Sequence, residues 1–206
     1  EEELQQVVAV LAKDGQEAVG SMGDDTPTAV LSQQPRLLYD FFRQQFAQVT
    51  NPAIDPIRER HVMSLATIIG REHNVFNEAS GDADRVAFES PILMYTDLKQ
   101  LREMDPTHYK HKTLSLAFGA SQEGRADDLK GAVTQLIESA ITAVRDEQVV
   151  IVILSDRDLQ QGQLMIPAAM AVGAVQQALV DNNLRCDSNI IIETASARDP
   201  HHMAVL

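Results

Sequence analysis

The sequence predicts an α/β protein in which a parallel sheet flanked by helices forms either a partial TIM-barrel-like structure or a small open sheet. Three observations lead to this fold class. Residues 149–154 are six consecutive branched aliphatic residues, typical of a central strand buried on both faces. Residues 129–144 place apolar side chains on one helical face. A second apolar helix, 166–180, leads to another buried strand at 189–194. Strand, crossover helix and strand in succession imply parallel pairing.

The chain is long enough for one well-packed core, with 206 residues of which 44% are hydrophobic. We therefore expect a single domain, with a mostly helical and irregular part at 1–112 and a βαβ core at 113–206. Residues 1–13 carry apolar side chains at helical spacing and predict a short amphipathic helix, which Asp14 and Gly15 end.

The next two segments combine a turn-rich loop with an aromatic stripe. Residues 20–27 lack the Lys-Ser/Thr ending of a phosphate-binding loop, and Asp24 and Asp25 would repel an anion, so a rigid connector is favoured. Pro35 is expected to begin a helix that packs three phenylalanines into the core: Phe41, Phe42 and Phe46.

A proline-stiffened segment, 48–59, interrupts this pattern. Its apolar Ile54 and Ile57 favour packing against another domain. Asp55 and Pro56 are an N-cap and first-turn pair, and they predict a helix that runs to Gly70.

Residues 71–96 look irregular, with a short edge strand at 85–88. Thr96 is expected to cap a brief helix that ends near residues 104–106, and the first strand of the sheet is expected at 113–118. His108 and His111 are three residues apart, a spacing that suits two ligands of one metal ion, but no third ligand is evident nearby.

The charge balance and the single cysteine exclude several classes of function. There are 30 acidic and 17 basic residues, a net charge of -13, which disfavours binding to nucleic acid or to an anionic membrane surface. No apolar run is long enough to cross a bilayer, and no signal peptide opens the chain, so we expect a cytoplasmic protein. The lone Cys186 can form no internal disulfide, and a structural role is favoured.

Polar residues gather where the predicted strands end, and this edge of a parallel sheet is where ligands commonly bind. They are Ser155, Asp156 and Arg157 after the central strand, and Glu193, Thr194, Ser196, Arg198, Asp199, His201 and His202 after the last. A barrel-type enzyme would use Asp156 or Glu193 as the general base. The same residues also make ordinary caps and ion pairs, and Asp199 with Pro200 predicts a helix start.

Five motifs make the sequence resemble a known family. They are residues 20–27 (GSMGDDTP), 46–59 (FAQVTNPAIDPIRE), 90–93 (SPIL), 154–157 (LSDR) and 193–202 (ETASARDPHH). In this order they resemble the central domain of the large (alpha) subunit of bacterial glutamate synthase, and the match covers essentially the whole chain. The family commonly has a second proline where this chain has Ala53, which loosens the stiff segment.

The resemblance implies a role without catalytic, cofactor-binding or metal-binding residues in this chain. In the family, a glutamine amidotransferase domain releases ammonia, which reaches an FMN-binding synthase domain and adds to 2-oxoglutarate. NADPH supplies electrons through a small (beta) subunit and iron–sulfur clusters. The amidotransferase and FMN-synthase domains are the implied partners, and the central domain joins them. Cys186 is not the counterpart of the amidotransferase cysteine.

Three hypotheses follow. The first is a spacer domain of glutamate synthase, expected to be inactive alone; the start without Met and the C-terminal helix cut in its apolar stretch lead us to expect a segment of a longer chain. Its docking faces are expected around residues 22–27 and 49–57. The second is a free-standing α/β barrel-type enzyme that uses Asp156 and Glu193. The third is a metal protein that uses His108 and His111.

Overall fold

The structure, a computed structural model, describes residues 4–16, 18, 26–45, 53–72, 76, 85–119 and 125–206. The chain divides into two compact units, one formed by Glu1–Ala53 with Ala195–Leu206 and the other by Ile54–Thr194. The larger unit, Ile54–Thr194, contains the sheet. The prediction of a single domain stays a prediction.

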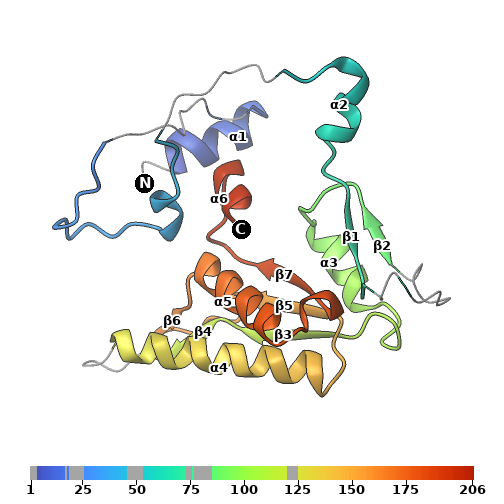
Figure 1. The fold of residues 1–206 in the computed structure, drawn as a ribbon. Coiled ribbons are helices and arrows are strands. Elements are labelled where there is room, and N and C mark those ends of the chain that lie inside the picture. The colour runs from blue at the N-terminus through green and yellow to red at the C-terminus, as the bar shows by residue number, and fades with distance from the viewer. Residues whose placement is uncertain are drawn as a thin grey trace. The chain divides into compact units, whose positions relative to one another are not determined.

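The larger unit is built on a three-stranded parallel sheet in the order β3-β5-β7 (Figure 1). The strands are β3 (His111–Ser115), β5 (Ile151–Ser155) and β7 (Asn189–Glu193). Their register places Ser115 beside Ser155 and Ser155 beside Glu193, so the three strands end level with one another. The parallel α/β prediction is confirmed, and the described strands form an open sheet and no closed barrel.

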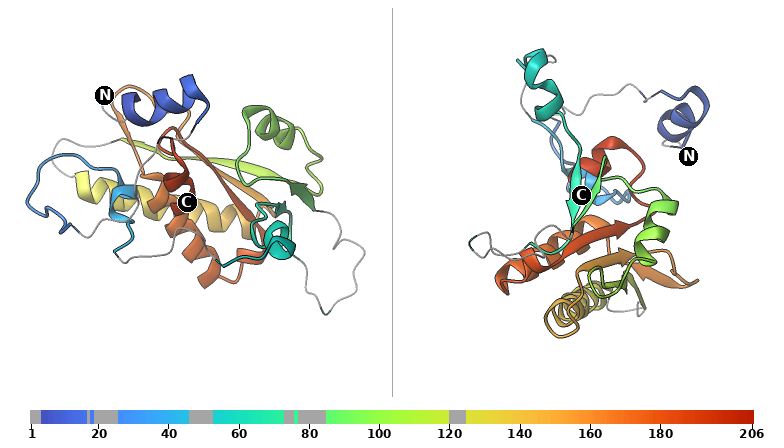
Figure 2. Two further views of the ribbon diagram at one scale, coloured as in Figure 1. Left: turned by 90° about the horizontal axis from the view of Figure 1, so that it is seen from above. Right: turned by 90° about the vertical axis from the view of Figure 1, so that its right-hand side faces the viewer.

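Helices cover both faces of the sheet (Figure 2). On one face lie α4 (Arg125–Arg145) and α5 (Ala168–Asp181), which confirm the two predicted apolar helices. The other face is covered by α3 (Tyr95–Arg102). Every residue of β5 is buried, because Val152 and Leu154 pack with α4 and α5 while Ile151 and Ile153 pack with α3.

Two antiparallel strand pairs accompany the sheet. One pair joins β1 (Thr67–Ile69) to β2 (Val86–Phe88), and the other joins β4 (Ala117–Gly119) to β6 (Gln163–Met165). β2 confirms the predicted edge strand at 85–88, whereas the sequence analysis did not find β6. A short 3-10 helix, η4 (Arg185–Asp187), precedes β7.

The predicted strand at 113–118 is divided between two sheets. It begins earlier, at His111, and the break falls at Leu116. There the Leu116 N–H donates to the Ser155 carbonyl, while the Leu116 carbonyl accepts from the Ile166 N–H, each over 2.8 Å. One residue thus ties β5 to the start of α5.

The helix predicted from Asp55 to Gly70 begins as expected but ends early. In α2 (Pro56–Val62) the Asp55 carboxylate accepts hydrogen bonds from two backbone N–H groups of the first turn, which confirms the N-cap. The predicted C-terminal half is wrong because Thr67–Ile69 is the strand β1, a run of β-branched residues that pairs with β2. Thr96 is likewise no cap, since it lies inside α3, whose N-cap is Met94.

The smaller unit contains short helical turns. A π-helical turn, η1 (Leu4–Val8), continues into α1 (Ala9–Asp14), which ends at Gly15 in the left-handed conformation and confirms the predicted N-terminal helix. The unit closes with α6 (Pro200–Val205), and its Asp199 N-cap confirms the predicted start.

The aromatic helix predicted from Pro35 is wrong. Only one 3-10 turn forms, η2 (Leu38–Phe41), and Phe41 and Phe42 are about half exposed, at 56% and 51%. The buried aromatic residue is Tyr39 instead, because it packs on α6 within the same unit. Phe46 lies outside the described residues, as do residues 22–25 and 49–52 of the two predicted docking faces.

Two glycine substitutions are expected to change stability in opposite directions. Gly70 has a φ of +146°, and a Cβ there would lie 2.7 Å from Arg85 Cγ, so Gly70→Ala should destabilise the chain by about 1–3 kcal/mol. The matched control, Gly173→Ala, lies in exposed α5 backbone where a Cβ meets nothing within 4 Å. It should stabilise the chain by about 0.5–1 kcal/mol. Urea titrations followed by circular dichroism compare the two, and equal shifts would contradict the strain at Gly70.

Candidate functional site

The carboxyl ends of β5 and β7 hold a cluster of paired charges around Glu193. The Ser155 hydroxyl donates to Glu193 Oε2 over 2.7 Å, and Arg157 Nε donates to Oε1 over 2.6 Å. Arg102, which reaches across from α3, donates to Oε2 over 3.2 Å. Because both carboxylate oxygens accept hydrogen bonds and the side chain is only 11% exposed, Glu193 is the centre of this cluster.

The surroundings of Glu193 favour its charged form. Burial acts to raise the pKa of its carboxyl, but hydrogen bonds from Ser155 and Arg157, with the positive charges of Arg157 and Arg102, outweigh it. The pKa therefore lies below the ordinary value of 4.5. The hydrogen bond and charge of Glu193 in turn raise the pKa of Arg157. A general base works best with a pKa near the operating pH, so Glu193 is poorly suited to that role.

Asp156 is held in the same edge by its neighbours. Its carboxylate accepts a hydrogen bond of 2.6 Å from the Thr194 hydroxyl, and its N–H donates to the Glu193 carbonyl over 3.1 Å. Arg157 also lies over the ring of Tyr95, 5.4 Å from its centroid. The barrel-type enzyme hypothesis that relied on Asp156 and Glu193 is therefore not favoured, since one carboxylate is ion-paired and the sheet is open.

The residues from Ala195 onward belong to the smaller unit, and three of them contact Tyr39. The Tyr39 ring stacks on His202 with centroids 4.5 Å apart, and its hydroxyl shares a hydrogen bond with Ser196 over 3.1 Å. His201 Nε2 lies 3.1 Å from the Tyr39 carbonyl. These contacts lock the C-terminal segment onto η2, and they give both histidines structural partners.

The ring of His202 has a defined hydrogen-bonding environment. The Arg198 N–H donates to His202 Nδ1 over 3.2 Å, so Nδ1 acts as an acceptor. His202 Nε2 then lies 3.5 Å from a carboxylate oxygen of Asp199, whose other oxygen caps α6. His202 is 4% exposed, and this burial fits a packing role.

Within the described parts of the chain, the histidine pair and the cysteine have no further ligands beside them that would complete a metal centre. His108 lies in the turn after α3 and His111 in β3. Burial, followed by the charge of Arg102, lowers the pKa of His111, which favours the neutral imidazole. Among the described residues no group of three His, Cys, Asp or Glu side chains is placed to hold a metal ion. Cys186 is exposed in η4, where its carbonyl accepts from the Glu72 N–H over 2.9 Å.

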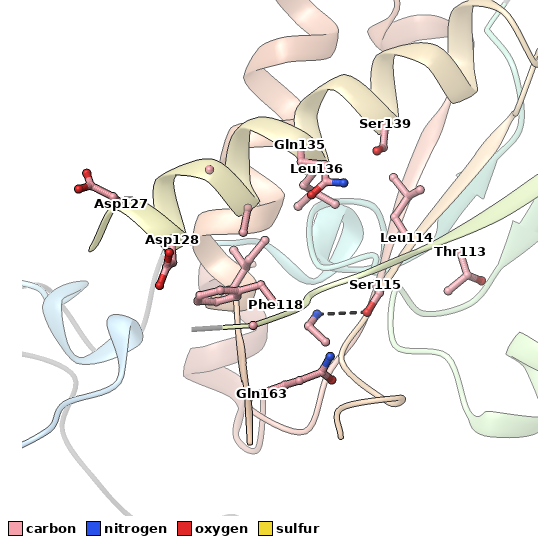
Figure 3. A pocket seen from close by; sticks show the side chains of 15 residues that line it. Thr113, Leu114, Ser115, Phe118, Asp127, Asp128, Gln135, Leu136, Ser139 and Gln163 are labelled. Carbon is pink, nitrogen blue, oxygen red and sulfur yellow. Dashed lines mark hydrogen bonds between the residues drawn. The ribbon is translucent and has the colours of Figure 1, made fainter. Parts of the chain in front are cut away.

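A hollow of about 700 Å³ lies elsewhere in the larger unit, between α4 and the strands β3, β4 and β6 (Figure 3). Neither Asp156 nor Glu193 lines it. No sequence pattern predicts this hollow, because it depends on how α4 crosses the strands. Arg102 and Tyr39 were missed for the same reason, since their partners lie 91 and 157 residues away along the chain.

None of the described helices combines the length with the apolar character that a bilayer crossing requires. The parallel sheet and the charge cluster at the carboxyl ends of its strands define an open-sheet α/β domain. In this domain, ion pairs join the end of β7 to the end of β5 and to α3.

Comparison with known proteins gives the family. The model of the glutamate synthase central domain family matches residues 1–206, and the chain belongs to this family. It is 41% identical to the chloroplastic ferredoxin-dependent glutamate synthase of Oryza sativa, 38% identical to ferredoxin-dependent glutamate synthase 2 of Synechocystis and 36% identical to the NADH glutamate synthase of Saccharomyces cerevisiae. All of this chain is covered in each comparison, but it spans only 10–13% of the length of these relatives.

Proposed function

We propose that this chain is a spacer domain of a glutamate synthase, which joins the glutamine amidotransferase domain to the FMN-binding synthase domain and sets the distance between them. The observation that carries the proposal is the family match over residues 1–206 in relatives about eight to ten times longer, as their covered share of 10–13% implies. The paired state of Glu193 supports it, because this edge has the chemistry of a structural ion-pair cluster. Catalysis, cofactor binding and metal binding are assigned to other domains.

For the parent enzyme we propose the synthesis of L-glutamate from L-glutamine and 2-oxoglutarate with internal ammonia transfer, FMN and iron–sulfur clusters. We further propose that it is a bacterial, cytoplasmic enzyme that takes electrons from NADPH through a small (beta) subunit. The relatives include enzymes named for ferredoxin and for NADH. The donor is therefore tested directly, by comparing NADPH, NADH and reduced ferredoxin with the complete enzyme.

A spacer role predicts that damage to this domain uncouples two activities without abolishing either. In the complete polypeptide, Glu193→Ala removes the centre of the ion-pair cluster. Glutamine-dependent glutamate synthesis is expected to fall, while glutamine hydrolysis and ammonia-dependent glutamate synthesis persist. The three rates are measured on the same preparation.

The matched control is Glu103→Ala, because Glu103, the residue after α3, pairs with Lys99 at the surface and its side chain is 66% exposed. All three rates should stay at the level of the unchanged enzyme. If Glu193→Ala abolished ammonia-dependent synthesis in a folded enzyme, this edge would take part in the chemistry and the spacer role would be wrong.

A further inference from the structure

The outer edge of β3 has backbone groups that bond to no other strand among the described residues. Among the described strands β3 pairs only with β5. The Leu116 N–H donates to the Ser155 carbonyl, and the Lys110 carbonyl accepts from the Ile151 N–H. Because successive residues of a strand turn their backbone groups to opposite sides, the even-numbered residues bond to β5. The groups that point outward belong to His111, Thr113 and Ser115.

The hollow beside α4 lies along this same edge (Figure 3). Thr113 and Ser115 line it from β3, and both are exposed. From α4 it is lined by Gly131, Gln135 and Ser139, which are four residues apart and share one helical face. A Cβ at Gly131 would meet nothing within 4 Å, so the space beside the helix is open there. The helix therefore forms a wall beside an edge strand that has room for a neighbour.

The hollow between β3 and α4, called the groove from here on, has the properties of a site for an extended peptide. Three consecutive residues of β3 line it, Thr113 to Ser115, which is about 10 Å of strand. Hydroxyl and amide groups line part of it, and Leu114, Phe118 and Leu136 line another part, so it offers both polar partners for a backbone and apolar contacts for side chains. Asp127 brings negative charge at the start of α4, and the described lining residues include no Lys or Arg. Charge complementarity favours a basic residue at that end of the peptide.

We propose that an extended segment of the glutamate synthase polypeptide outside residues 1–206 docks in this groove and adds a strand beside β3, with a Lys or Arg facing Asp127. Strand addition satisfies the outward backbone groups of β3 and removes an exposed edge. The source of the segment rests on the proposed function, under which this chain is one domain of a longer enzyme. The relatives, of which this chain covers 10–13%, have ample chain to supply it.

Site-specific photo-cross-linking in the complete polypeptide tests the docking. The photoreactive amino acid p-benzoylphenylalanine replaces Gln135 in the groove or, as a control, Lys130, which is exposed on α4 outside the groove. Mass spectrometry then identifies the peptide captured after irradiation. Gln135 is expected to capture a segment of the same chain outside residues 1–206, and Lys130 is expected not to capture it.

A blocking variant checks that the groove is the cause. Gly131→Trp fills the groove and should abolish the capture at Gln135, whereas Gly173→Trp, on exposed α5 backbone with open space around it, should leave it intact. Capture of a second copy, of a peptide within residues 1–206, or of nothing beyond the Lys130 control would overturn the docking proposal. The activity ratios of Glu193→Ala do not depend on this result, so the spacer role and the docked strand fail separately.

Discussion

Replacing Ile153 with alanine is expected to lower the free energy of unfolding by about 2–5 kcal/mol, the range for truncating a fully buried aliphatic residue. Ile153 is 0% exposed at the centre of β5 and packs against Leu98 and Leu101 of α3. The neighbouring strands hold it in place on both sides, so the surrounding side chains cannot collapse into the space left by the missing atoms. Since the chain has no Trp, urea unfolding is followed by far-ultraviolet circular dichroism.

The control for this change is the same substitution on the surface. Ile57 is 92% exposed in the first turn of α2, and Ile57→Ala should change the free energy of unfolding by less than about 0.5 kcal/mol. A small effect of Ile153→Ala, comparable with that of Ile57→Ala, would mean that β5 is not the central buried strand.

Replacing Glu193 with alanine is the second large expected effect, at about 2 kcal/mol of lost stability near neutral pH. The substitution removes three hydrogen bonds and leaves Ser155 and Arg102 without their acceptor. The loss is smaller than for a fully buried pair, because the Arg157 side chain is 55% exposed and solvent screens its charge. Glu193→Gln keeps the shape of the side chain and loses its charge, so its free energy of unfolding should lie between those of the unchanged chain and Glu193→Ala.

The effect of Glu193→Ala should depend on pH in a direction fixed by the lowered pKa. The Glu193 carboxyl has a pKa below 4.5 in the folded chain. As the pH falls, this carboxyl is therefore protonated in the unfolded chain at a higher pH than in the folded chain. The stabilisation is complete above the unfolded pKa and is lost as the pH falls through the folded pKa. The difference between the unchanged chain and Glu193→Ala should thus be large at pH 7 and shrink below about pH 4.5. A difference that grew in acid would contradict the ion-paired state.

The features that could be predicted from the sequence are those with a local physical cause. The apolar run at 149–154 has no polar face to expose, so only a strand covered on both sides accommodates it, as β5 shows. Asp55 and Asp199, each followed by a proline, supply both the acceptor and the fixed backbone angle of a helix start. The gathering of polar residues at the strand ends followed from parallel pairing alone.

The features that could not be predicted depend on partners distant in the chain. The apolar spacing that continues α2 fits helix and strand alike, and pairing with Val86–Phe88 decides for strand β1. The prediction that the phenylalanines fill the core was wrong, because the buried aromatic residue of this segment is Tyr39, which stacks on His202 of α6. From the sequence, Glu193 was a candidate general base. Its ion pair with Arg102 could not be predicted, because Arg102 lies in α3, far away along the chain. Spacing along the chain carries no record of such contacts.

The alternation of side chains along β5 determines how the larger unit can come apart. Ile151 and Ile153 pack in the core on one face of the sheet, and Val152 and Leu154 pack in the core on the other face. Neither core can therefore unfold without exposing side chains of β5. Opening is therefore all-or-none, and the β5 amides should exchange with solvent only through global unfolding. For the spacer role proposed above, the consequence is that the larger unit has no half-open form that would change the distance between the domains it joins.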